Sequence, residues 1–196
     1  IFTWNGTTSG VKVPNGDWIP DDRKGLTICD ATSAIFGMPI DYKKCDVITW
    51  SWQKILGGEA AHGMIAISPR VVERLENYKP NWPIPKLFRL AENNKVIKGI
   101  FDGNTINTPS MICVEDIIDS LNWVSGQGGL DSLINKSQNS LKKISDWIDD
   151  RHWLTFLCEI KDNNYISNTG ITFKITEDWF VNKNESDQRV VMAEIC

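Results

Sequence analysis

The sequence lacks the features that mark a membrane protein or a nucleic-acid-binding protein. Its apolar stretches stay well below the roughly 20 residues that a membrane-spanning helix needs. Lysine and arginine are dispersed along the chain, and the net charge of -4 gives no electrostatic reason to bind nucleic acid. We therefore expect neither a membrane nor a nucleic acid among the partners of this protein.

Cysteine is also sparse, and its spacing excludes two common kinds of site. The five cysteines are odd in number, lie far apart and contain no Cys-x-x-Cys pair. They are Cys29, Cys45, Cys113, Cys158 and Cys196. This pattern predicts neither a zinc site nor a disulfide framework, so we expect no metal and a reduced, cytoplasmic setting.

The composition that remains is that of an ordinary globular protein. Hydrophobic residues make up 41% of the 196 residues and charged residues 23%, enough for one substantial domain or for one domain and part of another. Residues 1–4 read as the inside of a strand, and residues 190–196 stop within an apolar-periodic stretch. We expect both ends of the parent protein to be missing, with a processed mature chain as the alternative.

Strand-like segments dominate the first part of the chain. Residues 25–30, 46–52 and 62–68 are apolar or β-branched runs, which predict three strands. Pro69 suits the first turn of a helix that we expect to continue to Tyr78. Residues 79–108 carry several prolines and little periodicity, which predicts an irregular excursion.

Two long helices and two more strands follow. We predict a helix that begins at Thr108 and Pro109, with Thr108 as its N-cap, and ends near residue 125. Met111, Ile118 and Leu121 mark one apolar side of it, together with residue 114. A second helix is predicted over residues 130–149, and strands over 153–160 and 169–175. This order indicates an α/β fold: the end of an α/β domain, helical connectors and the start of a small α+β domain.

Asp30 and Lys54 follow neighbouring predicted strands, where ligands of open α/β sheets bind. A lysine fixed in such a place suits covalent attachment of a carbonyl compound. An acid beside it suits the ring nitrogen of a pyridine cofactor, which must stay protonated to withdraw electrons. The alternatives remain open at this point, since a lysine after a strand is often solvated and an acid there often caps a helix.

The segments Asp30–Ala34, Ser51–Gly63 and Asn104–Ser110 resemble phosphoserine aminotransferase, a class-V family of pyridoxal-phosphate-dependent enzymes. The resemblance runs over nearly the whole chain, is strongest over residues 5–109 and fades after about residue 175. It implies a mainly parallel sheet of the aspartate-aminotransferase type, with residues 1–145 in the large cofactor domain and its connecting helices, and 146–196 in the small domain.

The resemblance also implies an activity, a cofactor and partners. The family exchanges an amino group between phosphoserine or glutamate and the corresponding keto acids in serine biosynthesis, as a homodimer with pyridoxal 5'-phosphate. Lys54 resembles the Schiff-base lysine that also moves the proton, and Asp30 resembles the partner of the pyridine nitrogen. Thr7 resembles the threonine near the ring hydroxyl, and Gln53 a residue that contacts the cofactor phosphate.

Asn107 and Thr108 resemble the pair that reaches the cofactor phosphate from the neighbouring subunit. A helix beginning at Thr108 would favour an anion there through its free amides. Thr108 as a mere helix cap and Gln53 as a strand cap are the plainer alternatives. We interpret His62 as structural, and Gly57 and Gly58 as the tight turn behind the lysine.

Other functional groups of the family have no counterpart in these residues. The substrate arginines, the cofactor-stacking aromatic ring and the N-terminal phosphate loop fall outside the chain, so we do not expect it to catalyse turnover alone. Lys86, Arg89 and Lys98 are interpreted as solvated charges. Two alternatives stay open: a serine–pyruvate or alanine–glyoxylate aminotransferase of the same fold, and a non-catalytic relative that keeps the fold.

Overall fold

The structure, a computed structural model, describes residues 1–160 and 162–195. Its strands are short: β1 (Phe2–Thr3), β2 (Asn5–Gly6), β3 (Val11–Lys12), β4 (Ile28–Asp30), β5 (Val47–Trp50), β6 (Met64–Ile67), β7 (Ala91–Glu92), β8 (Lys95–Val96), β9 (Leu154–Phe156) and β10 (Phe173–Ile175). Its α-helices are α1 (Pro69–Asn77), α2 (Lys98–Phe101), α3 (Met111–Gly126), α4 (Gly129–Asp149), α5 (Asp178–Val181) and α6 (Glu185–Ile195). Short 3-10 turns cover Tyr42–Lys44, Lys86–Phe88 and Asn163–Tyr165. No helix within the described ranges is long and apolar enough to span a bilayer.

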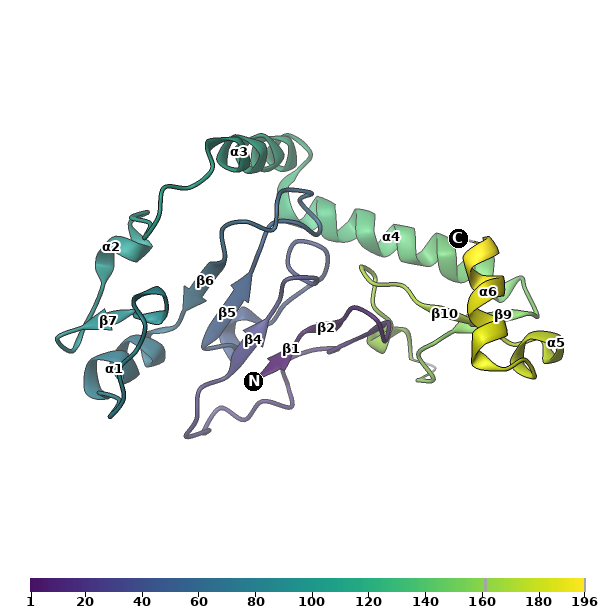
Figure 1. The fold of residues 1–196 in the computed structure, drawn as a ribbon, viewed down its shortest axis with the longest axis horizontal. Coiled ribbons are helices and arrows are strands. Elements are labelled where there is room, and N and C mark those ends of the chain that lie inside the picture. Colours follow the sequence, from purple (N-terminus) through teal and green to yellow (C-terminus); the bar gives the residue numbers. More distant parts are fainter. Residues whose placement is uncertain (161, 196) are drawn as a thin grey trace.

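The main sheet has the strand order β1-β4-β5-β6. β4 runs parallel to both β1 and β5, whereas β6 is antiparallel to β5. Asp30 pairs with Thr3 on one side and with Thr49 on the other, so the carboxyl ends of β1, β4 and β5 meet at one edge (Figure 1). The three predicted strands are confirmed, each shorter than expected, and the sheet is mainly parallel.

One hydrophobic cluster packs against this sheet. Its buried members are Trp4, Cys29, Ala31, Ala34, Ile35, Met38, Ile40, Cys45 and Ile48. They come from β4, from β5 and from the turn that follows β4, and Trp4 comes from the segment just after β1. The cluster therefore fixes the chain on both sides of Asp30.

Asp46 holds the opposite edge of the sheet through a buried ion network. Its carboxylate accepts hydrogen bonds from Arg23 at 2.9 Å, from Arg70 at 3.1 Å and from the backbone amide of Thr27 at 2.8 Å. Ser68, which precedes α1, donates a further bond to the same carboxylate. Burial alone would raise the pKa of Asp46, but these bonds and charges outweigh it and hold the pKa below its usual value of 3.8.

The two long helices are present, but the first begins later than predicted. α3 starts at Met111 with Ser110 as its N-cap residue, so the prediction of Thr108 as N-cap is wrong. Thr108 lies two residues before that cap, in a segment where Pro109 keeps the preceding backbone out of the helical region. α4 over Gly129–Asp149 confirms the second helix within one residue, and α1 begins at Pro69 as expected.

The buried face of α3 also differs from the apolar side marked in the sequence. Ile117 and Val124 are buried, whereas Met111, Ile118 and Leu121 are 63%, 44% and 39% exposed. Ile117 and Val124 pack with residues of the segment after β5 and of α4, which select that face of the helix.

The C-terminal part of the chain has its own small cluster. β9 and β10 form an antiparallel pair, and Leu154 and Ile175 from these strands pack with Ile148 of α4 and Phe180 of α5. In Figure 1, α4 leads from the main sheet to this part, where α5 and α6 flank the β9–β10 pair. Residues 167–170, between β9 and β10, return to the main sheet and hydrogen-bond with its loops.

Candidate cofactor site

Asp30 is the last residue of β4, and its side chain is exposed at the carboxyl edge of the sheet. Its Oδ1 atom accepts hydrogen bonds from the backbone amide of Thr32 at 2.9 Å and from the Thr32 hydroxyl at 2.7 Å. These bonds cap the turn over residues 31–38, so the capping alternative is observed. Within the described residues Oδ2 makes no hydrogen bond, which leaves one carboxylate oxygen free for a ligand.

Lys54 lies in the loop that continues β5 beyond the same edge of the sheet. Its carbonyl accepts a hydrogen bond from the Gly57 amide at 3.1 Å, and Gly57 has a φ of 68°, which a side chain would strain. The Gly58 amide bonds back to the Trp52 carbonyl at 3.1 Å. The expected tight turn behind the lysine is confirmed, and the side chains of Gln53 and Lys54 are left exposed.

An aromatic contact joins the loop of Lys54 to the turn of Asp30. Phe36, from the turn after β4, stacks on Trp52 with ring centroids 6.2 Å apart and planes at 23°. Trp50 meets Trp52 edge to face at 6.0 Å. Trp52 also packs against a cluster that includes Leu56 and Ile117, so α3 supports the lysine loop from behind. Both tryptophans therefore act as packing residues.

Thr7 lies in the turn of the β2–β3 hairpin. Asn5, in the same hairpin, is hydrogen-bonded to the turn that follows Asp30. Asn5 donates from Nδ2 to the Ser33 hydroxyl at 3.0 Å and to the Thr169 hydroxyl at 3.2 Å. A Cβ at Gly170 would stand 3.1 Å from the Thr7 carbonyl, so the chain of the β9–β10 connection runs close behind this hairpin.

This polar junction was missed from the sequence. Thr169 donates from Oγ1 to the Ser33 carbonyl, and Asn168 donates to the Gly37 carbonyl at 2.7 Å. Asn5 is 4% exposed and Asn168 5% exposed. The bond from Asn5 to Thr169 joins residues 164 apart in sequence, and the bond from Asn168 to Gly37 joins residues 131 apart. No local pattern could have identified them, because the contacts exist only once the β9–β10 connection folds back on the Asp30 turn.

Asn107 and Thr108 are exposed in the connection between α2 and α3. Figure 1 places this connection beyond β5 and β6, on the other side from the β2–β3 hairpin. Thr7, Asp30, Gln53 and Lys54 thus lie along one edge of the sheet. Asn107 and Thr108 lie away from the end of that edge where Thr7 and Asp30 are found.

The side chains of this edge suit an organic cofactor. Among the described residues, no group of three or more His, Cys, Asp or Glu side chains could hold a metal ion. Cys29, Cys45, Cys113 and Cys158 are free thiols, whereas Cys196 lies outside the described residues. A free carboxylate oxygen and an exposed amine at the ends of two adjacent parallel strands can together hold a protonated ring nitrogen and a carbonyl group.

Comparison with known proteins finds relatives in sequence and in fold. No protein-family model matches the sequence. The phosphoserine aminotransferase of Methanosarcina barkeri is 55% identical over 175 residues, which cover 89% of this chain and 47% of that protein. The chain thus spans about half the length of the curated relatives that it matches.

Solved structures give the same picture for the fold. The pyridoxal-phosphate-bound phosphoserine aminotransferase of Trichomonas vaginalis superposes with a TM-score of 0.70 at 20% identity, covering 96% of this chain and 47% of that one. An aspartate aminotransferase of Thermus thermophilus superposes with a TM-score of 0.69 at 18% identity, covering 90% and 48%. Over the part that they share, this chain is similar in sequence to phosphoserine aminotransferases and has the aspartate-aminotransferase type of fold.

Proposed function

We propose that this chain supplies the cofactor lysine of a pyridoxal-phosphate-dependent phosphoserine transaminase that acts in serine biosynthesis. The proposal rests on one observation above all: Asp30 and the loop of Lys54 follow adjacent parallel strands at one sheet edge. The 55% identity to a phosphoserine aminotransferase over 175 residues supports the substrate class. The reaction would interconvert phosphoserine and 2-oxoglutarate with 3-phosphohydroxypyruvate and glutamate.

Asp30 and Lys54 divide the chemistry between them. Pyridoxal phosphate supplies a ring that withdraws electrons from the substrate α-carbon. Lys54 would hold the cofactor through Nζ and would serve as the general base and acid for the proton at that carbon. Asp30 would offer Oδ2 to the ring N–H, while Thr32 fixes the carboxylate through Oδ1. The tight turn at Gly57 keeps the lysine in place without burying its amine.

The remaining contacts belong to the cofactor ring and phosphate. Thr7 would bond near the ring hydroxyl, and Gln53 would contact the phosphate on the same subunit. Asn107 and Thr108 would reach the phosphate of the neighbouring subunit in a homodimer. Both residues are exposed, and they lie on the other side of the sheet from the β2–β3 hairpin (Figure 1). This position fits a contact with the neighbouring subunit better than a contact within their own subunit.

The organisation of the parent enzyme follows from the same proposal. Residues 1–145 would belong to the large cofactor domain with its connecting helices, and residues 146–196 would begin the small domain. The separate cluster around Leu154 and Ile175 supports this division. Free cysteines among the described residues fit a reducing, cytoplasmic location.

Covalent labelling tests the central assignment. The full-length protein is incubated with pyridoxal phosphate, reduced with borohydride and digested, and the peptides are mapped by mass spectrometry. We expect the pyridoxyl group on Lys54 and its loss in Lys54→Ala. Lys43→Ala, which removes an exposed lysine before β5, is the matched control and should keep the label. Label on lysines in general, with none preferred, would refute the assignment.

A second assay tests the substrate. The full-length protein is given phosphoserine, serine or alanine as the amino donor, with 2-oxoglutarate as acceptor. Phosphoserine should be preferred, since a site built to bind a phosphate is left with unpaired charges by a donor that lacks it. Equal use of serine or alanine would overturn the substrate while leaving the lysine and the fold in place.

A further inference from the structure

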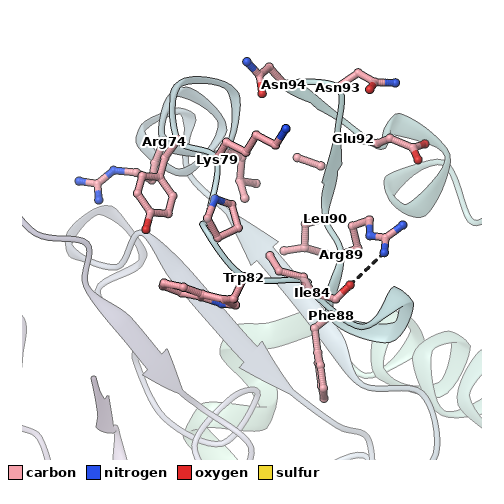
Figure 2. Close-up of a pocket in the computed structure, with 14 residues that line it drawn as sticks. Arg74, Lys79, Trp82, Ile84, Phe88, Arg89, Leu90, Glu92, Asn93 and Asn94 are labelled. Carbon is pink, nitrogen blue, oxygen red and sulfur yellow. Dashed lines mark hydrogen bonds between the residues drawn. The ribbon is translucent and has the colours of Figure 1, made fainter.

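A concave site whose lining includes neither Asp30 nor Lys54 lies between the end of α1 and the β7–β8 hairpin (Figure 2). Its volume is about 490 Å³, within the range of small-molecule pockets. Apolar and aromatic side chains form most of its walls. They include Tyr78, Pro80, Trp82, Ile84, Phe88 and Leu90.

Hydrogen bonds to backbone carbonyls hold the walls in place before any ligand binds. The Tyr78 amide bonds to the Arg74 carbonyl at 3.0 Å and ends α1. Arg89 donates from Nη2 to the Ile84 carbonyl at 2.9 Å, the bond drawn in Figure 2. The Ile97 amide bonds to the Leu90 carbonyl at 2.9 Å and fixes the base of the hairpin. A preformed pocket costs a ligand little ordering entropy.

The hairpin turn adds to this rigidity. Asn93 and Asn94 have φ angles of 51° and 58°, so both central residues are left-handed. That is the pattern of a two-residue turn whose twist matches the two flanking strands. The two asparagines therefore form the turn of a regular hairpin at one end of the hollow. The prediction of irregular structure for this segment is wrong at the hairpin.

Positive charge gathers around this apolar surface. Arg74, Lys79 and Arg89 line the hollow, and Glu92 is its one acidic residue. The chain as a whole carries a net charge of -4, so the local excess of cations is opposite in sign to the rest of the protein. In Figure 2 the amine of Lys79 extends from the end of α1 toward the hairpin. The interpretation of Arg89 as a solvated charge is wrong, because it is half-buried and bonded to Ile84.

We propose that this hollow binds a small aromatic carboxylate. The ring displaces water from the apolar wall that Trp82 helps to form, and Trp82 is 62% exposed without a ligand. The carboxylate pairs with Lys79, which unlike Arg89 makes no hydrogen bond among the described residues. Charge complementarity and apolar walls together select an anion with a flat apolar body over a neutral or fully polar ligand. The site is separate from the transaminase site and does not depend on it.

The test uses 1-naphthoate as the anionic probe and 1-naphthalenemethanol as its neutral counterpart, each titrated into the purified chain by calorimetry. We expect saturable binding of naphthoate, at least fivefold tighter than the alcohol and weaker at high salt. Lys79→Met should reduce naphthoate affinity at least fivefold and leave the alcohol unchanged. Trp82→Ala should weaken both probes.

Matched variants separate this site from general stickiness. Lys43→Met removes a lysine outside the hollow. Trp18→Ala removes a tryptophan outside the hollow whose exposed fraction, 56%, is similar to the 62% of Trp82. Neither should change naphthoate affinity, and neither should Lys54→Ala. Absence of saturable binding, equal affinity for the alcohol, or equal effects of the paired variants would overturn the proposal. Loss of binding in Lys54→Ala would overturn it as well, by placing the probe at the cofactor edge.

Discussion

The sheet edge that carries Asp30 and the hollow beside the β7–β8 hairpin use aromatic side chains in opposite ways. Trp4, next to the sheet edge, is 1% exposed, whereas Trp82, at the hollow, is 62% exposed. The first region is held by packing, which fixes where a carboxylate points. The second is held by backbone hydrogen bonds, which leave aromatic surface free for a ligand. The difference predicts that similar substitutions have very different costs in the two regions.

Replacing Trp4 gives the largest expected effect. Trp4→Ala should lower the free energy of unfolding by about 3–5 kcal/mol, because it opens a cavity in the cluster that supports Asp30. Trp82→Ala should change the same quantity by less than about 0.5 kcal/mol, since it loses little packing. Urea unfolding followed by circular dichroism measures both. Equal costs in the two variants would show that the comparison of the regions is mistaken.

Replacing Asp46 gives the next largest expected loss of stability. Asp46→Asn leaves Arg23 and Arg70 without their carboxylate, and we expect a loss of roughly 2–3 kcal/mol. This is less than for a fully buried pair, because Arg70 is 39% exposed and water can screen it. The control is Asp21→Asn, which removes an exposed carboxylate that pairs with Lys44 and should cost much less than Asp46→Asn, because water screens that pair.

The same carboxylate makes a pH dependence that can be checked separately. The pKa of Asp46 in the folded chain lies below its ordinary value of 3.8, so its ionised form is favoured by folding. The stabilisation is complete above that ordinary value and is lost as the pH falls through the lower folded pKa. The melting temperature of the wild type should therefore drop on acidification below about pH 4 more steeply than that of Asp46→Asn. Parallel curves would argue against the ion network.

Asp30→Asn separates structure from function at the sheet edge. Asparagine keeps an Oδ1 atom that can accept the two bonds from Thr32, so the free energy of unfolding should change by less than about 0.5 kcal/mol. It loses the negative charge proposed for the pyridine nitrogen, so turnover by the full-length enzyme should fall much more than its stability. A large loss of stability with turnover preserved would leave Asp30 only its capping role.

More of the sheet edge than of the hollow could be predicted from the sequence. Asp30 and Lys54 could be placed, because short apolar runs predict neighbouring strands and parallel strands bring their carboxyl ends together. The hairpin at Asn93 and Asn94 was missed, although two consecutive asparagines between Glu92 and Lys95 were an available turn signal. The hollow depends on contacts between α1 and this hairpin, which no local pattern encodes.

Helix α3 shows a different limit. Its position was predicted within three residues, but its buried face was not. Apolar residues occur around most of the helix, and the side predicted from periodicity contained Ile118 and not Ile117. Contact with Leu56 and α4 selects Ile117, which is 7% exposed against 44% for Ile118. Tertiary contacts with the loop of Lys54 and with α4 therefore decide which face of α3 is buried.

The smallest expected effect tests whether the hairpin wall of the hollow is as regular as its φ angles indicate. Asn94→Gly removes a Cβ from a left-handed residue and should stabilise the chain by up to about 0.5 kcal/mol, whereas Asn94→Ala should destabilise it, because alanine tolerates that conformation less well than asparagine. Thermal unfolding of the two variants beside the wild type measures the difference. If the glycine variant is the less stable one, the turn does not hold its left-handed conformation in solution. The hollow would then not be preformed, and naphthoate binding would have to order it.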